Sequence, residues 1–162
     1  MAIATATPGS TGNPVNAPLG VGNETGVNAY GGVGILKKTG LSSDIPISTA
    51  PATLATAYNG DIWIEDIIFS TDATGLASGT NMEILQSNAN GLAAPVSEAV
   101  SSLGANTTHD FTGSTPFTTC GQFVVPQGST LQIGSTSAAC TGAGKWFMWI
   151  KYRPLVASAS LA

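Results

Sequence analysis

The sequence predicts an all-β protein: a β-sandwich or jelly-roll-like domain that follows an extended N-terminal arm. Short apolar segments recur between turns rich in Gly and Ser, which is typical of the strands of a sandwich or barrel. Only one segment carries a helical pattern, and no segment repeats at a fixed period. With 162 residues, the chain is long enough to bury a core without disulfides or metal. We therefore expect an arm over residues 1–30 and one β-sandwich domain over residues 31–162.

The first 30 residues predict an arm that becomes ordered only against a partner. They contain five Gly, three Pro and one charged residue, Glu24, and they show neither the period of a strand nor that of a helix. Such a segment cannot bury enough apolar surface to order itself. We expect it to lie extended against another chain. Its candidate contact residues are Pro8, Pro14, Val15, Pro18 and Leu19.

The first half of the domain predicts a series of strands. Residues 33–38 alternate as a short strand at a sheet edge or at the start of the domain. The stretch around Pro46 and Pro51 forms an edge strand or a loop, because proline cannot donate to a strand ladder. A long strand follows over Asp61–Thr71. After a polar link with two Gly, the alternation over residues 80–87 predicts the next strand.

The one candidate helix lies between residues 91 and 106. Pro95 suits the first turn of a helix and Gly104 suits its end. Ser and Val lower the helical propensity, so we expect a short helix or an irregular loop. The apolar residues at helical spacing are Leu92, Val96, Ala99, Val100 and Leu103.

The remainder of the chain predicts strands again. Apolar residues 123–125 run into a turn over residues 126–129, and Leu131 and Ile133 begin the return strand. The closing strand covers residues 144–155 and is rich in aromatic side chains.

The two most hydrophobic strands carry apolar side chains on both faces. In Asp61–Thr71, the apolar triplets 62–64 and 67–69 flank the acidic pair Glu65–Asp66. A strand of an isolated sandwich alternates between core and solvent. Either an oligomer interface covers the second face, which we favour, or the segment 92–103 packs over it. The candidate interface residues are Ile62, Ile64, Phe147 and Trp149.

Charged groups are few and form no pattern typical of a catalytic or metal site. A net charge of −4 with five Lys and Arg excludes a nucleic-acid reader built on a basic stripe. The single histidine, His109, precedes Asp110, but adjacent strand residues point to opposite faces, so Asp110 cannot orient its ring. We expect no enzyme, no catalytic residue, no metal and no cofactor. Four acidic residues are considered as calcium ligands, but they lack the spacing of a calcium loop, and we expect them to be carboxylates of turns and strand edges. These residues are Glu65, Asp66, Asp72 and Glu83.

The cysteines and the N-terminus bear on cellular location. Cys120 and Cys140 lack the spacing of a zinc site, and they are either two buried thiols or a bridge between neighbouring strands. The N-terminus has neither the basic nor the apolar region of a secretory signal, and no apolar stretch is long enough to span a membrane. We expect synthesis in a cytoplasm and no membrane partner.

The chain resembles the decoration or cement proteins of tailed-bacteriophage heads. The resemblance is carried by the Gly/Pro/Thr-rich arm, by "GDIWIEDIIFSTDATGLASGTNMEIL" followed by "FVVPQGSTLQI", and by the aromatic closing strand "KWFMWIKYRPL". It implies a β-sandwich or jelly roll, usually a homotrimer, on the exterior of the capsid. It also implies that the protein bridges major capsid subunits and stabilises the virion without catalysis.

The alternative function is a receptor- or glycan-binding module of a phage fibre or spike. Sugar sites use exposed aromatic side chains beside amides and carboxylates. The strand positions of the candidate aromatics indicate core or interface instead. These aromatics are Tyr58, Trp63, Trp146 and Trp149. A pilin or surface-layer subunit is less favoured, because the chain shows no secretory signal.

Overall fold

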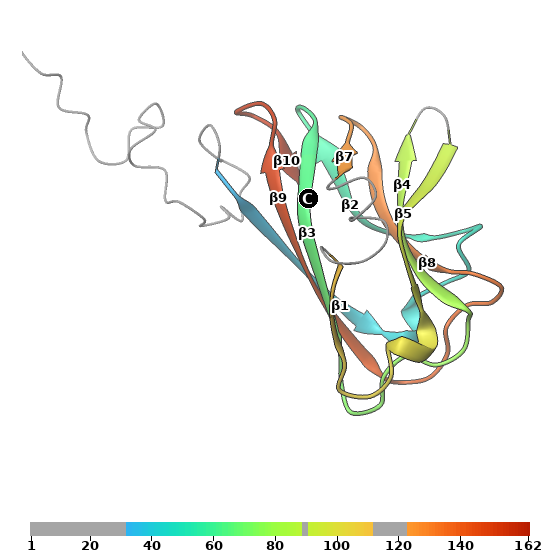
Figure 1. Cartoon of the computed structure of the whole chain (residues 1–162). Coiled ribbons are helices and arrows are strands. Elements are labelled where there is room, and N and C mark those ends of the chain that lie inside the picture. The colour runs from blue at the N-terminus through green and yellow to red at the C-terminus, as the bar shows by residue number, and fades with distance from the viewer. Residues whose placement is uncertain (1–31, 89–90, 112–122) are drawn as a thin grey trace, which may run out of the picture.

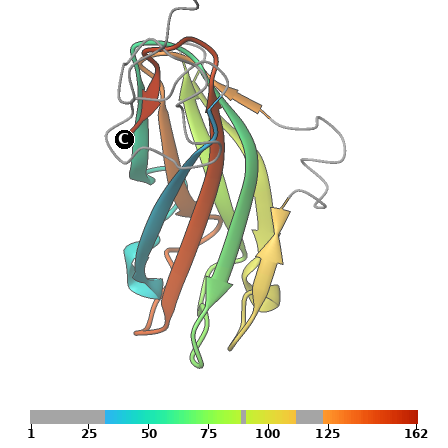
Figure 2. The same ribbon diagram turned by 90° about the vertical axis from the view of Figure 1, so that its left-hand side faces the viewer.

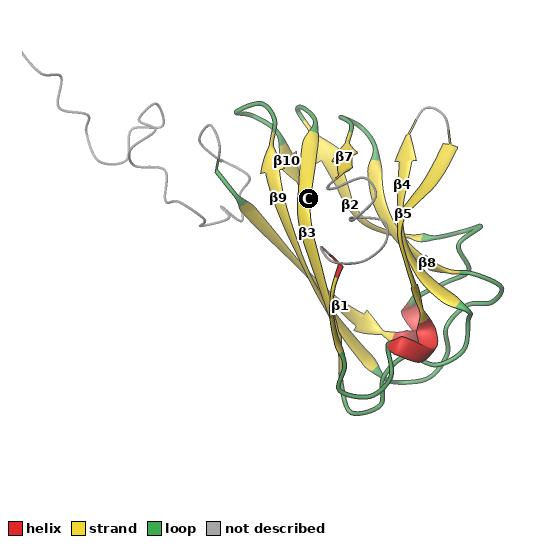
Figure 3. Cartoon of the chain, in the orientation of Figure 1, coloured by secondary structure: helices red, strands yellow, loops and turns green. Residues whose placement is uncertain are grey.

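The computed structural model describes residues 32–88, 91–111 and 123–162, which form two facing β-sheets (Figures 1 and 3). The strands are β1 (Gly34–Leu41), β2 (Ala52–Tyr58), β3 (Ile62–Thr71), β4 (Asn81–Asn88), β5 (Gly91–Ala99), β6 (Thr108–Asp110), β7 (Phe123–Val125), β8 (Thr130–Ser135), β9 (Lys145–Pro154) and β10 (Ser160–Leu161). Two single-turn 3-10 helices, η2 (Ser42–Asp44) and η3 (Val100–Ser102), are the described helical elements. The predicted all-β sandwich is confirmed.

Every strand pair in the two sheets is antiparallel. The first sheet has the order β1–β9–β3–β6, with β7 also pairing with β3. The second sheet has the order β10–β2–β8–β4–β5. Figure 2 looks onto the first sheet and shows β1, β9, β3 and β6 side by side. The two long strands that the sequence marks as most hydrophobic, β3 and β9, are neighbours at its centre.

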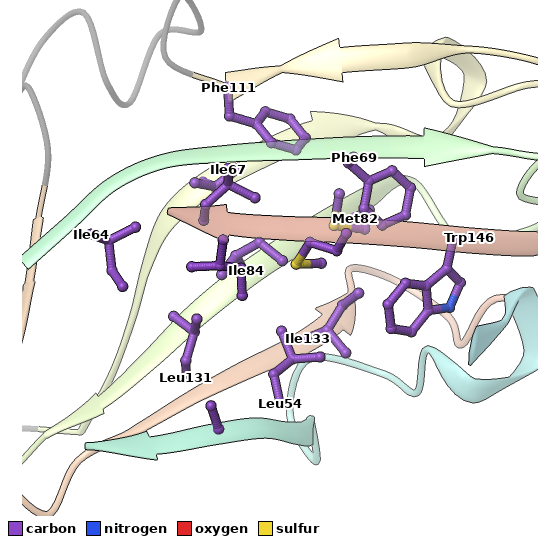
Figure 4. Packing of buried hydrophobic residues seen from close by; sticks show 14 of the residues in the cluster. Leu54, Ile64, Ile67, Phe69, Met82, Ile84, Phe111, Leu131, Ile133 and Trp146 are labelled. Carbon is purple, nitrogen blue, oxygen red and sulfur yellow. The ribbon is translucent and has the colours of Figure 1, made fainter. Parts of the chain in front are cut away.

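The core lies between the two sheets, where side chains of β3 and β9 meet those of β4 and β8 (Figure 4). Phe69 stacks on Trp146 with ring centroids 5.9 Å apart and an interplanar angle of 16°. The indole Nε1 of Trp146 donates to the carbonyl oxygen of Leu41 at 2.9 Å, so this buried N–H is satisfied. The core also holds Ile45, Ile67, Met82, Ile84, Leu103, Phe111, Leu131, Ile133 and Met148.

A β-bulge in β3 explains its two apolar triplets. Ile64 pairs with Tyr152, whereas Asp66 pairs with the adjacent Lys151, so Glu65 is one extra residue on β3. The extra residue shifts the alternation, and residues on both sides of it therefore turn toward the same face. Ile62 and Ile64 before the bulge, and Ile67 and Phe69 after it, are all fully buried.

The prediction that Ile62 and Ile64 lie at an oligomer interface is therefore wrong. Both side chains are 0% exposed and pack in the core of their own protomer. Phe147 and Trp149 point the other way, because β9 alternates between buried and exposed residues without a bulge. These two remain exposed on the outer side of the first sheet.

The segment predicted as a helix or an irregular loop forms a strand instead. Residues 91–99 make β5, which pairs with β4 at the edge of the second sheet, and the helical turn is confined to η3. The β4–β5 register shifts between Ile84 and Gln86, opposite the stretch that contains Pro95, and an edge strand with an irregularity tolerates proline. Val96 is buried in the core. The segment thus belongs to the sheet opposite β3 and β9 and does not cover their outer face.

Candidate functional site

The large apolar side chains exposed among the described residues gather in two places. On the outer side of the first sheet lie Ile35, Leu41, Val124, Phe147 and Trp149, together with half-buried Trp63 and Ile68. We call this surface the aromatic face. At one end of the sandwich lie Tyr58, Leu155 and Val156, which we call the apolar tip.

The aromatic face is built on the neighbouring strands β1, β9, β3 and β7. Phe147 and Trp149 follow one another on its surface, with ring centroids 6.5 Å apart and an interplanar angle of 27°. Each remains 37% exposed. The register places Trp149 beside Ile68, and Trp63 between Arg153 and Val124. The face therefore carries two apolar groups, Trp149 with Phe147 and Ile68 in one and Trp63 with Val124 in the other, and charged side chains of β3 and β9 lie between them.

Positive charge in the chain is confined to two strands of this sheet. All five Lys and Arg residues lie on β1 or β9. Lys37 alternates outward with Ile35 on β1, and Lys145, Lys151 and Arg153 alternate outward with Phe147 and Trp149 on β9. The acidic residues of the same sheet lie on two of its other three strands, Glu65 and Asp66 on β3 and Asp110 on β6. The sheet is positive on one side and negative on the other.

The bulge residue Glu65 joins these two sides through ion pairs. Its carboxylate accepts a 2.7 Å hydrogen bond from Nε of Arg153 and lies 3.3 Å from Nζ of Lys151. Burial raises the pKa of the Glu65 carboxyl, but the hydrogen bonds and charges of Arg153 and Lys151 outweigh burial and hold the pKa below its usual value. Glu65 is therefore ionised at neutral pH and holds the two cations on the outer side of the sheet, toward the end of β9 that leads to Leu155 and Val156.

The apolar tip consists of the most exposed large apolar residues outside the aromatic face. Tyr58, Leu155 and Val156 are 50%, 47% and 46% exposed. Val156 lies directly over Gly60, where a Cβ atom would come within 2.2 Å of its Cγ2, so a side chain at position 60 would displace the tip. The N-terminal end of β1 lies at the same end of the first sheet, because Gly34 pairs with Tyr152. The tip thus lies near the point at which residues 1–31 join the domain.

His109 connects the edges of the two sheets. Its ring Nε2 lies 3.1 Å from the carbonyl oxygen of Ser102, and its Nδ1 lies 3.9 Å from Oε2 of Glu98 on β5. Asp110 is exposed on the opposite side of β6, so the predicted divergence of these two neighbours is confirmed. These contacts give His109 a structural role. Absence of catalysis stays a prediction.

The acidic residues considered as calcium ligands are dispersed. Asp72 accepts hydrogen bonds from the backbone N–H groups of Thr74 and Gly75 at 2.9 and 3.2 Å, as a turn carboxylate does. These bonds, with that of Thr74 the strongest, lower the pKa of the Asp72 carboxyl. Within the described ranges, no three His, Cys, Asp or Glu residues cluster as metal ligands do.

The aromatic residues considered for sugar binding fall in three separate places. Trp63 and Trp149 lie on the aromatic face, four pairs apart along β9, and Tyr58 lies on the apolar tip. Trp146 is buried in the core. A site that uses all four is therefore excluded, and a site that uses Trp63 and Trp149 remains compatible with the structure.

The remaining predicted residues are a cysteine and the arm. Cys140 is buried beside the carbonyl oxygen of Ser78, and burial raises the pKa of its thiol. Its possible partner Cys120 lies outside the described residues, so the pairing stays open. The predicted arm contacts also lie outside them: Pro8, Pro14, Val15, Pro18 and Leu19.

Sequence reasoning missed Tyr58, Leu155 and Val156 as a surface and Ile35 and Val124 as members of the aromatic face. The signal available for the tip was the apolar pair 155–156 placed after the last hydrophobic strand.

Comparison of the chain with protein-family models, curated proteins and solved structures finds no match. Across the part of the chain that the structure describes, no helix has the length and apolar character needed to cross a membrane.

Proposed function

We propose that the protein is a structural component of a phage virion, made in the host cytoplasm, that binds the outside of the capsid and bridges major capsid subunits. It acts as a homo-oligomer. The observation that carries the proposal is the apolar tip: three large side chains that are half exposed, at the end of the domain where residues 1–31 join it. A tip and an arm at one end give two attachment points on one assembly, and the rigid sandwich joins them.

The tip can supply a useful share of the binding free energy. Fully burying a large apolar side chain contributes about 1.5–3 kcal/mol, so burying the exposed half of each tip residue contributes about 1 kcal/mol. Such contacts involve no ion pair and are therefore insensitive to salt. A protein that binds the assembled capsid but not free subunits favours assembly by mass action, by about 2.7 kcal/mol at a hundredfold excess over Kd.

The test measures binding to particles purified from phage in which the gene for this chain is deleted. The double variant Leu155→Asp/Val156→Asp should bind at least roughly tenfold more weakly than the wild type, because about 2 kcal/mol of apolar contact is lost. The matched control is Ala138→Asp/Ala139→Asp, which adds the same charge at exposed positions beyond β8, at the opposite end of the domain. Equal binding by the tip variant and the control would contradict the proposal.

A receptor- or glycan-binding module is the second candidate. It is favoured by Trp63 and Trp149, which flank the cluster of Glu65, Lys151 and Arg153 on one exposed face. In that case the aromatic face would bind the sugar, and Trp149→Ser would abolish binding to a glycan array.

A further inference from the structure

The charges of the aromatic face are arranged in rows that run across the strands. One row at the middle of the sheet is Lys37, Trp149, Ile68 and Asp110, each residue paired in register with the next. The row begins with a cation on β1, continues with two apolar side chains, and ends with an anion on β6. A second row, Ile35, Lys151 and Asp66, runs in the same direction, with its cation on β9 and its anion on β3.

A surface with this arrangement is complementary to itself. We propose that a second copy of the chain covers the aromatic face, with the two first sheets packed face to face about a two-fold axis that runs parallel to β9 and β3. This axis exchanges the left and right sides of the sheet and leaves the position along the strands unchanged. Lys37 of each copy then faces Asp110 of the other, and Trp149 packs on Ile68 of the other.

The competing symmetric arrangement is disfavoured by charge. A two-fold axis perpendicular to the strands would place β1 over β1 and β6 over β6. Lys37 would then approach Lys37 of the second copy, and Asp110 would approach Asp110. Like charges that face one another across an interface destabilise the complex, whereas opposite charges that face one another stabilise it and fix its register. The distribution of Lys and Arg on β1 and β9 thus selects the axis parallel to the strands.

The size of the face fits a dimer that dissociates within an experimentally accessible range. The ten residues of β9 span roughly 30 Å, and four strands spaced about 4.8 Å apart are roughly 15–20 Å wide. The contact therefore covers roughly 500 Å² on each copy, close to the lower limit for a specific interface. Face-to-face packing of two sheets also matches the aligned packing, about 10 Å apart, of natural sandwiches.

This inference deepens the homo-oligomeric part of the proposed function, since it names the contact and its symmetry. It predicts a two-fold contact in place of the trimer that the resemblance implies. It does not require the apolar tip, which lies outside the aromatic face and stays available for the capsid.

The test is sedimentation velocity of the full chain from roughly 1 to 100 µM, a range chosen because contacts at the small end of the size scale tend to be weak. The wild type should form a dimer. Lys37→Glu and Asp110→Lys should each weaken the dimer by roughly tenfold or more, and the double variant should restore it, because the pair is reversed together. Both positions are exposed, and matching thermal melts will show that the variants fold.

Trp149→Ser provides a second test, with Tyr58→Ser on the apolar tip as the matched control. The first should be monomeric, and the second should remain dimeric. A wild type that is monomeric or trimeric would overturn the inference, and so would a double charge reversal that fails to restore the dimer. A monomeric wild type that needs Trp149 to bind a glycan would overturn it in favour of the glycan-binding function. A wild-type chain that forms the dimer but does not bind the particles would contradict the proposed function alone.

Discussion

Glu65→Gln removes one charge at the bulge of β3 and conserves the shape of the side chain. The wild-type carboxylate is bonded to Arg153 at 2.7 Å and lies 3.3 Å from Lys151. Its side chain is only 12% exposed, whereas those of Arg153 and Lys151 are 36% and 51% exposed. After the substitution the two cations can turn toward water, so the loss comes from the two interactions and leaves no buried charge behind.

The expected cost at neutral pH is about 1–2 kcal/mol. A hydrogen bond to a charged group contributes about 1.5–3 kcal/mol when buried, and exposure of the two cations reduces this toward the value of a surface pair. The pKa of Glu65 is lowered on folding from the ordinary value of 4.5. A carboxylate with a lowered pKa stabilises the folded state above about pH 4.5 and loses this contribution as the pH falls through the folded-state pKa. The difference between wild type and variant should therefore disappear in acid.

Urea denaturation measures the difference directly at a series of pH values. Glu83→Gln on β4 is the matched control, since it makes the same chemical change on the second sheet, away from Lys151 and Arg153. The control should cost less than about 0.5 kcal/mol at every pH. A cost for Glu65→Gln that is the same at pH 7 and in acid, or that equals the control, would refute the role assigned to the ion pairs.

Three further predictions concern the core, the sheet edges and the arm. Phe69→Ala should lower the free energy of unfolding by about 3–5 kcal/mol, because Phe69 is fully buried against Trp146. Phe147→Ala is the exposed control, measured by urea denaturation at concentrations where the chain is monomeric. Equal losses for the two variants would contradict the placement of Phe69 in the core. His109→Ala should lower the free energy of unfolding by no more than about 1 kcal/mol, because the ring is partly exposed and makes one hydrogen bond at 3.1 Å. A loss of stability above about 3 kcal/mol would show that His109 has a larger role. Deletion of residues 1–30 should leave the circular dichroism spectrum and melting of the β-domain unchanged while weakening attachment to particles; unfolding, or undiminished attachment, would show that the arm is misassigned.

The fold class and the faces of β9 could be predicted from the sequence because both depend on local alternation. Phe147, Trp149 and Lys151 point away from Trp146, Met148 and Ile150 in any regular strand, and β9 is regular. The faces of β3 could not be predicted in this way. The bulge at Glu65 depends on pairing with Tyr152 and Lys151, which are distant in sequence, and a single extra residue changes which side chains are buried.

The helix between residues 91 and 106 failed as a prediction for a similar reason. Val96 and Val100 are buried, as a helical face would require, but an edge strand followed by a 3-10 turn buries them equally well. Pairing with β4 decided between the two, and tertiary pairing commonly overrides a weak helical pattern. The division of charge across the aromatic face was also hidden, because it depends on the order of strands: Lys37 and Asp110 share a row only through β9 and β3.

The most direct test of the central claim, stabilisation of a capsid from outside, is a heat challenge of particles with and without this protein. Particles purified from the gene deletion should lose infectivity or release DNA at a lower temperature than the wild type. Adding back the purified full chain should restore their survival, and adding back Leu155→Asp/Val156→Asp should not. Equal survival of particles with and without the protein would contradict the account.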